Sequence, residues 1–364
     1  MDLFELVESL EGKPLNQKFL LLKNEFTLKG EREIIARWAD GFHDRDNKMR
    51  KEFQTTFHST FWELYLFQVL KRLDLTIDWE KNRPDFVITG PTELCIEAVV
   101  SEIKKDGRPE VDRNFDDIYS MTEPAWLDPD YETLMHEAIT RYSNSILGKR
   151  KKFQKEYSSL DWVRPIAPYV IALSSYAQVR YGKEYHYPMV ALLYGQYFDP
   201  HSKSYTKREY IIKPGTSSSI PLDIFSLDEM KCVSAVVFSC TVTMGKLASL
   251  VISDETLTHP TNFVFLIRED FDEPHFKIQI VSPESPEDLF DGLFIFHNPN
   301  ATNPLPRSLF EGTSAIQVWR EGSALAFEGE NLPLVARLNL TKIFLPGDMK
   351  NLVMFDAFNK FNSP

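Results

Sequence analysis

The sequence predicts an α/β protein in which helices flank a mixed central sheet, with further helices at the N-terminus and a β-rich elaboration at the C-terminus. Two observations predict this class. Apolar runs of strand length alternate with longer stretches of helical periodicity between residues 31 and 174. A Gly-Pro turn also joins two short apolar runs within residues 82–100, and this arrangement indicates a β-hairpin beside those helices.

The N-terminal part is predicted to be mainly helical. Residues 1–30 are polar and amphipathic, and a long helical stretch follows over about residues 31–73, interrupted near Gly41. A strand is expected at residues 75–79. Residues 104–130 are polar, acidic and punctuated by prolines, so we expect a long loop there, of the kind that is usually functional or mobile.

One long helix is expected from about residue 131 to 157, followed by a buried strand at residues 168–174. The helix carries apolar residues at helical spacing, which mark its buried stripe. They are Leu134, Ala138, Tyr142, Ile146, Phe153 and Tyr157. The resulting order of helix, three strands, helix and strand predicts a single α/β core for this part of the chain.

The remaining chain alternates strands and turns. A helix is expected at residues 188–198 and part of a hairpin at 205–213. Strands are expected at 232–240, 262–267 and 293–297, and short apolar runs continue over 315–346. We therefore divide the chain into a helical region (1–55), an α/β core with insertions (56–270) and a β-rich elaboration or small domain (271–364).

Two acids within the hairpin are the strongest functional signal. Asp85 and Glu97 each lie six residues from Pro91 in the turn. In an antiparallel hairpin closed there, the two residues fall opposite each other. Two carboxylates at that separation can share a divalent cation such as Mg²⁺ (or Mn²⁺), because hard cations prefer oxygen ligands. The chemistry that this arrangement suggests is metal-assisted phosphodiester cleavage.

Pro84-Asp85, followed by a strand and then Glu97-Ala98-Val99 on the next strand, resembles the PD-(D/E)XK, or restriction-endonuclease-like, nuclease superfamily. The resemblance covers about residues 55–175. It implies a restriction-endonuclease-like core in which Asp85 and Glu97 are catalytic metal ligands. Glu63, on the preceding helix, resembles the additional acid of many members and is a third candidate ligand. Val99 stands where the family usually has a lysine.

The resemblance also allows the lysine to come from the next helix, as in some members. Lys149 lies on the apolar stripe of the helix at 131–157, and an inward ammonium group needs a partner such as the hairpin carboxylates. Lys152, about 60° round the helix, is the second candidate. Because Asp85 and Glu97 repel each other without metal, Glu97→Gln is expected to hold or raise the stability of the metal-free protein.

Composition excludes several classes of protein. No apolar run is long enough for a membrane span, and the acidic N-terminus does not resemble a secretory signal. Three cysteines without zinc or disulfide spacing indicate a cytoplasmic protein. The net charge of −12 argues against broad DNA coating, but basic clusters flank the proposed site. Lys104, Lys105, Arg150 and Lys151 are the candidate nucleic-acid contacts.

The sequence therefore predicts a Mg²⁺-dependent nuclease acting on nucleic acid, with DNA the favoured substrate and defence or repair the role that fits the family. The alternative is a catalytically inactive nuclease fold that binds nucleic acid or a protein partner. A homodimer is left open. An Asn-Pro-rich element at residues 297–306 resembles one found in an uncharacterised bacterial group, and its asparagines are interpreted as turn caps.

Overall fold

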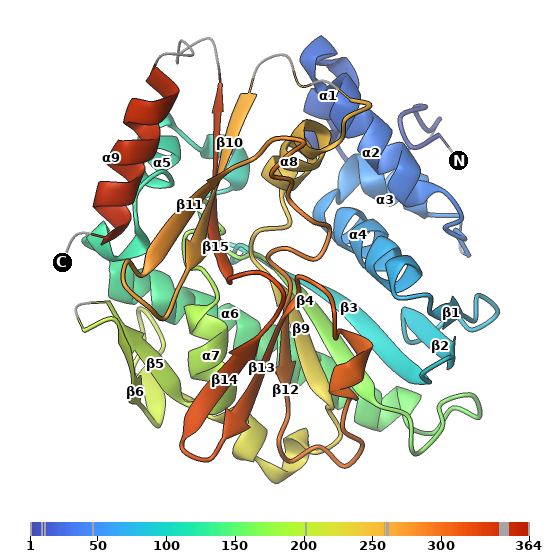
Figure 1. Cartoon of the computed structure of the whole chain (residues 1–364). Coiled ribbons are helices and arrows are strands. Elements are labelled where there is room, and N and C mark those ends of the chain that lie inside the picture. The colour runs from blue at the N-terminus through green and yellow to red at the C-terminus, as the bar shows by residue number, and fades with distance from the viewer. Residues whose placement is uncertain are drawn as a thin grey trace.

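A computed structural model describes residues 2–8, 10, 12–45, 47–200, 202–257, 259, 262–341 and 349–362 (Figure 1). Its α-helices within these residues are α1 (Gln17–Asn24), α2 (Lys29–Ala39), α3 (Met49–Thr55), α4 (His58–Arg72), α5 (Phe115–Ser120), α6 (Tyr131–Lys152), α7 (Tyr187–Tyr194), α8 (Met244–Ser253) and α9 (Lys350–Asn362). A π-helical turn at Phe153–Tyr157 continues α6.

The described residues form fifteen strands. They are β1 (Thr76–Ile77), β2 (Phe86–Gly90), β3 (Leu94–Glu102), β4 (Tyr169–Tyr176), β5 (Gln196–Asp199), β6 (Ser204–Lys207), β7 (Tyr210–Ile212), β8 (Ser219–Pro221), β9 (Ala235–Ser239), β10 (Asn262–Glu269), β11 (Phe276–Ile280), β12 (Phe294–His297), β13 (Ile316–Glu321), β14 (Ala324–Glu328) and β15 (Leu334–Thr341).

A mixed sheet forms the centre of the described chain. Its eight strands lie in the order β1-β2-β3-β4-β9-β12-β13-β14. β3, β4 and β9 are parallel neighbours, whereas β12 runs antiparallel to β9 and parallel to β13. β10, β11 and β15 form a separate antiparallel sheet. The predicted mixed central sheet is thus confirmed, and three strands beyond residue 270 belong to it.

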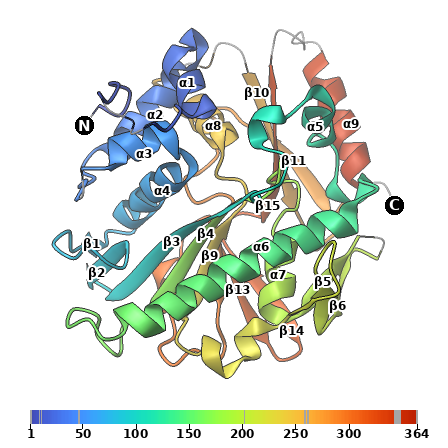
Figure 2. The ribbon, with the colours of Figure 1, turned by 180° about the vertical axis from the view of Figure 1, so that it is seen from behind.

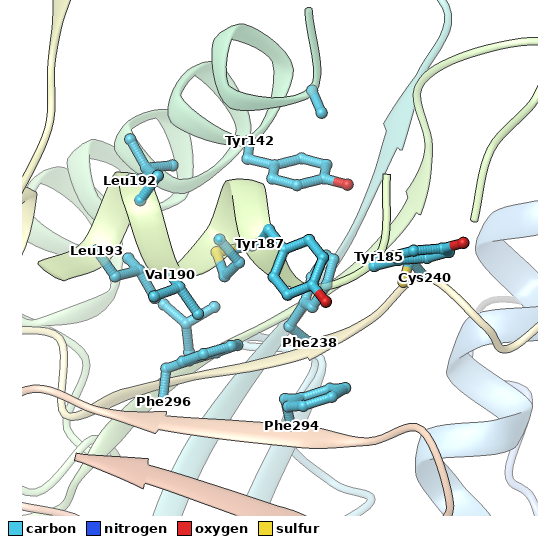
Figure 3. Close-up of a cluster of buried hydrophobic side chains, with 14 of the residues drawn as sticks. Tyr142, Tyr185, Tyr187, Val190, Leu192, Leu193, Phe238, Cys240, Phe294 and Phe296 are labelled. Atoms are coloured by element: carbon cyan, nitrogen blue, oxygen red, sulfur yellow. The ribbon is translucent and has the colours of Figure 1, made fainter. Parts of the chain in front are cut away.

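Helices cover both faces of the central sheet. α6 crosses one face in front of β3, β4 and β9 (Figure 2). Tyr142 of α6 and Leu192 and Leu193 of α7 belong there to a buried cluster that also contains Phe238 and Phe294 of the strands (Figure 3). On the opposite face, α2 and α4 belong to a second core cluster. All eight residues of β4 are buried, as expected for a parallel strand covered on both faces.

The second face is anchored by a tryptophan. Trp62 of α4 is fully buried, and its indole Nε1 donates a hydrogen bond to the carbonyl oxygen of Ala172 on β4, at 2.9 Å. Trp62 also stacks on Tyr65 one turn later, with ring centroids 5.5 Å apart. A buried indole N–H without a partner would be costly, so this bond fixes how α4 lies on the sheet. The position of α4 in turn sets the position of Glu63.

Several local expectations differ from the structure. The predicted loop at 104–130 contains α5, which begins at a reciprocal cap between Asn114 and Asp117. The helix expected at 188–198 ends at Tyr194, because Gly195 adopts φ +73° and the chain turns into β5. The interruption near Gly41 is confirmed, and α9 had no counterpart in the prediction. Residues 342–346 of the expected tail lie outside the described residues.

Candidate active site

The hairpin places the two acids opposite each other. β2 and β3 pair in an antiparallel register that joins Phe86 to Ile96, and continuing it by one residue brings Asp85 opposite Glu97. Asp85 lies just before β2 begins, where its Oδ2 accepts a hydrogen bond from the backbone N–H of Ala98 at 2.7 Å. The carboxylate thus binds the backbone of β3 next to the first residue of β2.

Glu97 is held through one of its two carboxylate oxygens. Its Oε1 accepts hydrogen bonds from Lys149 Nζ at 2.7 Å, from Lys152 Nζ at 3.0 Å and from the Tyr157 hydroxyl at 3.2 Å. Its Oε2 has no hydrogen-bond partner within the described structure, although Glu97 is only 1% exposed. A buried carboxylate oxygen without a partner is costly, so this atom marks a position suited to a cation or a donor.

The long helix α6 carries both lysines to the hairpin. Its buried residues Tyr142 and Ile146 pack on the sheet face, and Lys149 follows Ile146 along the same side. Lys149 therefore reaches Glu97 as predicted, with 24% of its side chain exposed. Lys152 is 41% exposed and also reaches the carboxylate, because its flexible stem compensates for its angle round the helix.

The π-helical turn after α6 supplies the third donor. Phe153 stacks on Tyr169 of β4 with ring centroids 3.9 Å apart, which ties this turn to the sheet. Tyr157 is 2% exposed, so it is a core residue as its place in the apolar stripe predicted. Its hydroxyl nevertheless faces Glu97. Sequence periodicity indicated the burial of Tyr157 but gave no sign of this hydrogen bond.

Two neighbouring acids hold their protons more tightly than usual. Burial, followed by the charge of Glu97, raises the pKa of Asp85 to about 6. Burial, followed by the charge of Asp85, raises the pKa of Glu63 on α4 to about 8. Repulsion between acids in a partly desolvated place favours the neutral form. Ionisable groups perturbed in this way cluster at functional sites, although structural networks can perturb them as well.

Glu63 and Asp85 line a small pocket between the hairpin and the N-terminal helices. The pocket has a volume of about 200 Å³ and also contains Glu52, Arg45 and Lys48 on its walls. Arg45 donates hydrogen bonds to the backbone carbonyl oxygens of Lys81 and Asp85, and the second of these is 2.9 Å long. It therefore holds the strand that carries Asp85. Arg45 lies in the connection between α2 and α3, and Glu52 lies in α3. The sequence did not point to either residue, because both are far from the hairpin along the chain.

The described residues of the pocket do not include a preformed set of three or more side-chain ligands for a metal ion. Among the described residues, no three histidine, cysteine, aspartate or glutamate side chains are grouped so that they could hold one. Glu63, Asp85 and Glu97 therefore do not form a preassembled three-acid site. Mg²⁺ usually keeps several waters and uses one or two carboxylates, so Asp85 and Glu97 with the unpartnered Oε2 still fit such an ion.

The candidate nucleic-acid contacts differ among themselves. Lys105 and Lys151 are exposed. Lys104 is exposed and lies 3.3 Å from Glu137. Arg150, by contrast, is buried, and its guanidinium donates to Glu229 at 2.6 Å and to Gln154 at 3.0 Å. Arg150 is thus engaged inside the protein, which corrects the expectation that it faces a nucleic acid. Its neighbour Lys149 faces the hairpin because successive residues on a helix point about 100° apart.

The Asn-Pro-rich element at residues 297–306 organises a turn at the end of β12. The Asn298 amide donates to the carbonyl oxygens of Met230 and Val233, at 2.9 and 2.8 Å. Its side-chain oxygen accepts from the backbone N–H of Asn300 at 2.9 Å. His297 is 3.0 Å from the Gln317 side chain. These contacts fit the predicted capping role.

Comparison of the chain with protein-family models, with curated proteins and with solved structures found no match. None of the helices in the described part of the chain is both long and apolar enough to span a membrane.

Proposed function

We propose that this chain is a metal-dependent nuclease with a restriction-endonuclease-like core, and that its centre lies between Asp85 and Glu97. The observation that carries the proposal is the burial and hydrogen bonding of the Glu97 carboxylate. The carboxylate is buried, one oxygen is bonded to two lysines and a tyrosine, and the other oxygen has no partner in the described structure. A purely structural ion pair would be expected to satisfy both oxygens.

Asp85 and Glu97 would hold Mg²⁺ or Mn²⁺, with waters or substrate oxygens as the remaining ligands. When bound, such an ion lowers the pKa of a coordinated water and neutralises charge on a scissile phosphate. The raised pKa values of Asp85 and Glu63 fit this assignment, because a nearby cation would favour the ionised carboxylates that now repel each other.

Lys149 would supply the positive charge that Val99 does not. Its ammonium group already contacts Glu97, and a quarter of its side chain is open to solvent. It can therefore orient a water molecule beside the carboxylate and offset negative charge that develops on a phosphate. Lys152 donates a hydrogen bond to the same Oε1 of Glu97 and also lies over the ring of Tyr157. These two contacts would keep the carboxylate in place.

The substrate would follow α6 away from this centre. A second pocket of about 410 Å³ lies beside α6 and is lined by Lys104, Arg108, Arg141 and Lys213. Arg141 precedes Lys149 by eight residues, which is about 12 Å along the helix. Such a distance spans a few phosphates of a nucleic-acid strand. Local basic residues of this kind can bind the backbone although the whole chain is acidic.

Cleavage assays on single-stranded and double-stranded DNA and RNA test this proposal. We expect the wild-type protein to cleave at least one of them in Mg²⁺ or Mn²⁺ and not in EDTA. Asp85→Asn, which removes a ligand charge with little change in shape, should abolish cleavage. Lys207→Met, an exposed change on β6, is the matched control and should leave cleavage intact. Activity that persists in EDTA or in Asp85→Asn would reject the proposed centre.

One observation favours the inactive alternative. Lys149 and Lys152 together already neutralise Glu97, and no three-ligand group is present in the part of the chain that the structure describes. A nuclease fold that had lost catalysis could keep this pair for stability and bind nucleic acid through the basic pocket beside α6. Salt-sensitive DNA binding without any metal-dependent cleavage would support this alternative.

A further inference from the structure

A third pocket lies away from the acidic centre, beyond the carboxyl ends of two parallel strands. Its volume is about 240 Å³. Gly182 and Lys183, which follow β4, form one side, and Cys240 to Gly245, which follow β9, form another. Tyr185 lies beside Cys240 at the edge of the core cluster and lines the same pocket (Figure 3). β15 and the region around α5 complete the walls.

The chain leaves β4 and β9 towards opposite faces of the sheet. After β4 it leads to α7, which packs on the same face as α6, whereas after β9 it leads to α8, which packs on the face of α2 and α4. Between two parallel strands, such a change of direction opens a crevice at their carboxyl ends. In open α/β sheets, this crevice is where ligands bind.

The charged side chains that line the crevice are all positive. The four basic residues are Lys18, Arg113, Lys183 and Arg337, and no aspartate or glutamate from the described chain lines the pocket. This is unusual in a chain whose net charge is −12. An enclosed space with one sign of charge concentrates ions of the opposite sign.

The carboxylates behind these basic groups are each shared between two cations. Glu110 contacts Lys18 at 2.8 Å and Arg113 at 3.6 Å. Asp128 contacts Lys183 at 3.0 Å and also Arg180. Glu287 contacts Lys246 at 2.7 Å and Arg337 at 2.9 Å. These three carboxylates thus contact six basic side chains, and Glu123 and Asp291 add negative charge near Lys183 and Lys246. The four basic residues that line the pocket still have N–H donors that these contacts do not use.

Two more features fit a ligand that joins a phosphate group to an uncharged ring. The N-terminus of α8 borders the pocket, and Thr243 caps it through a bond from the Gly245 N–H at 3.2 Å. Helix N-termini add positive potential for an anion. The wall also contains apolar side chains, among them Ile118, Met121 and Leu338, and these suit an uncharged ring better than a second phosphate.

From this combination we propose that the crevice binds a free nucleotide, with its phosphates against Lys18 and Arg113 and its base against Ile118 and Met121. The side chain of Arg113 is 20% exposed. Its Nε and one terminal nitrogen donate hydrogen bonds to the carbonyl oxygen of Val179, so its other terminal nitrogen is available to donate to a phosphate. Lys18 is 18% exposed and can reach the same space. This inference does not depend on the proposed nuclease centre.

Isothermal titration calorimetry on the full chain tests the proposal, in EDTA and low salt, with inorganic phosphate, AMP, ADP and ATP as ligands. We expect the nucleotides to bind more tightly than inorganic phosphate. Arg113→Met and Lys18→Met should each weaken binding about tenfold or more, because each removes a charge-assisted hydrogen bond. Lys207→Met, an exposed lysine on a separate sheet, should bind as the wild type does.

A variant of an apolar lining residue provides a second test in case Arg113→Met or Lys18→Met fails to fold. Met121 is half-buried and borders the proposed position of the base, so Met121→Glu should fold but weaken binding by placing a carboxylate in the pocket that holds the anionic nucleotide, whereas Met121→Gln should retain binding. Asp85→Asn should bind nucleotide normally, so loss of the metal site and loss of this site are distinguishable. The proposal is overturned if no nucleotide binds up to about 1 mM. Equal affinity of the wild type, Arg113→Met and Met121→Glu would overturn it as well.

Discussion

Replacing Glu97 by Gln measures how strongly the two lysines hold the candidate centre. The change keeps the shape of the side chain but removes a buried charge that lies 2.7 Å from Lys149 Nζ and 3.0 Å from Lys152 Nζ. One charge-assisted hydrogen bond contributes about 1.5–3 kcal/mol. The contact to Lys152 adds less than 1 kcal/mol, roughly, because that lysine is 41% exposed.

Relief of the repulsion between Glu97 and Asp85 offsets part of this loss. We therefore expect the free energy of unfolding of the metal-free protein to fall by about 2 kcal/mol at pH 7. Urea unfolding should show a lower midpoint with an unchanged slope. Glu93→Gln, which breaks the exposed pair with Arg164, is the matched control and should cost about 1 kcal/mol at most. A Glu97→Gln protein as stable as the wild type would refute the ion-pair reasoning.

Three further predictions follow from named contacts. If the protein cleaves DNA, Lys149→Met should abolish cleavage but keep Mn²⁺ binding, whereas exposed Lys151→Met should change only substrate affinity, and single-turnover kinetics would separate the two effects. Because burial raises the folded-state pKa of Glu63 from 4.5 to about 8, the metal-free protein should lose stability as pH rises between these values. The contribution of Glu63 should reach at most about 1.4 kcal/mol per pH unit, so the loss should become smaller in Glu63→Gln, as followed by urea unfolding, while the raised pKa of Asp85 leaves a loss below about pH 6. Arg150→Met should lower the melting temperature without changing DNA affinity, because Arg150 is bonded internally, whereas Lys105→Met should weaken DNA binding and reduce its salt dependence. Equal DNA affinities in these last two variants would contradict that assignment.

The hairpin was predictable because its signals are local. Asp85 and Glu97 lie at equal distances from Pro91, and the observed register extends to place them opposite each other. The apolar stripe of α6 likewise predicted that Lys149 reaches Glu97, and the 2.7 Å contact confirms it. Both predictions needed only the period of a strand or a helix and one turn.

The rest of the site depends on tertiary contacts that no local pattern encodes. Arg45 reaches the carbonyl oxygen of Asp85 from a connection forty residues earlier. The second lysine on Glu97 was only a second choice, so the carboxylate was expected to be less neutralised than it is. The expectation that Glu97→Gln would hold or raise stability considered only the repulsion between Asp85 and Glu97, whereas the two ion pairs of Glu97 now predict a loss of stability. Arg150 differs from the prediction because its partner Glu229, which is half exposed, comes from a turn 79 residues later in the chain.

The proposed centre is tested most directly by calorimetric titration of the metal-free protein with Mn²⁺ at pH 8, in the wild type and in Asp85→Asn. This measurement requires no knowledge of the substrate. We expect one Mn²⁺ site in the wild type and a loss of affinity of about tenfold or more in Asp85→Asn, because a charged oxygen ligand is replaced by a neutral one. No binding to the wild type, or equal affinity in both proteins, would contradict the assignment of Asp85 and Glu97 as a metal site.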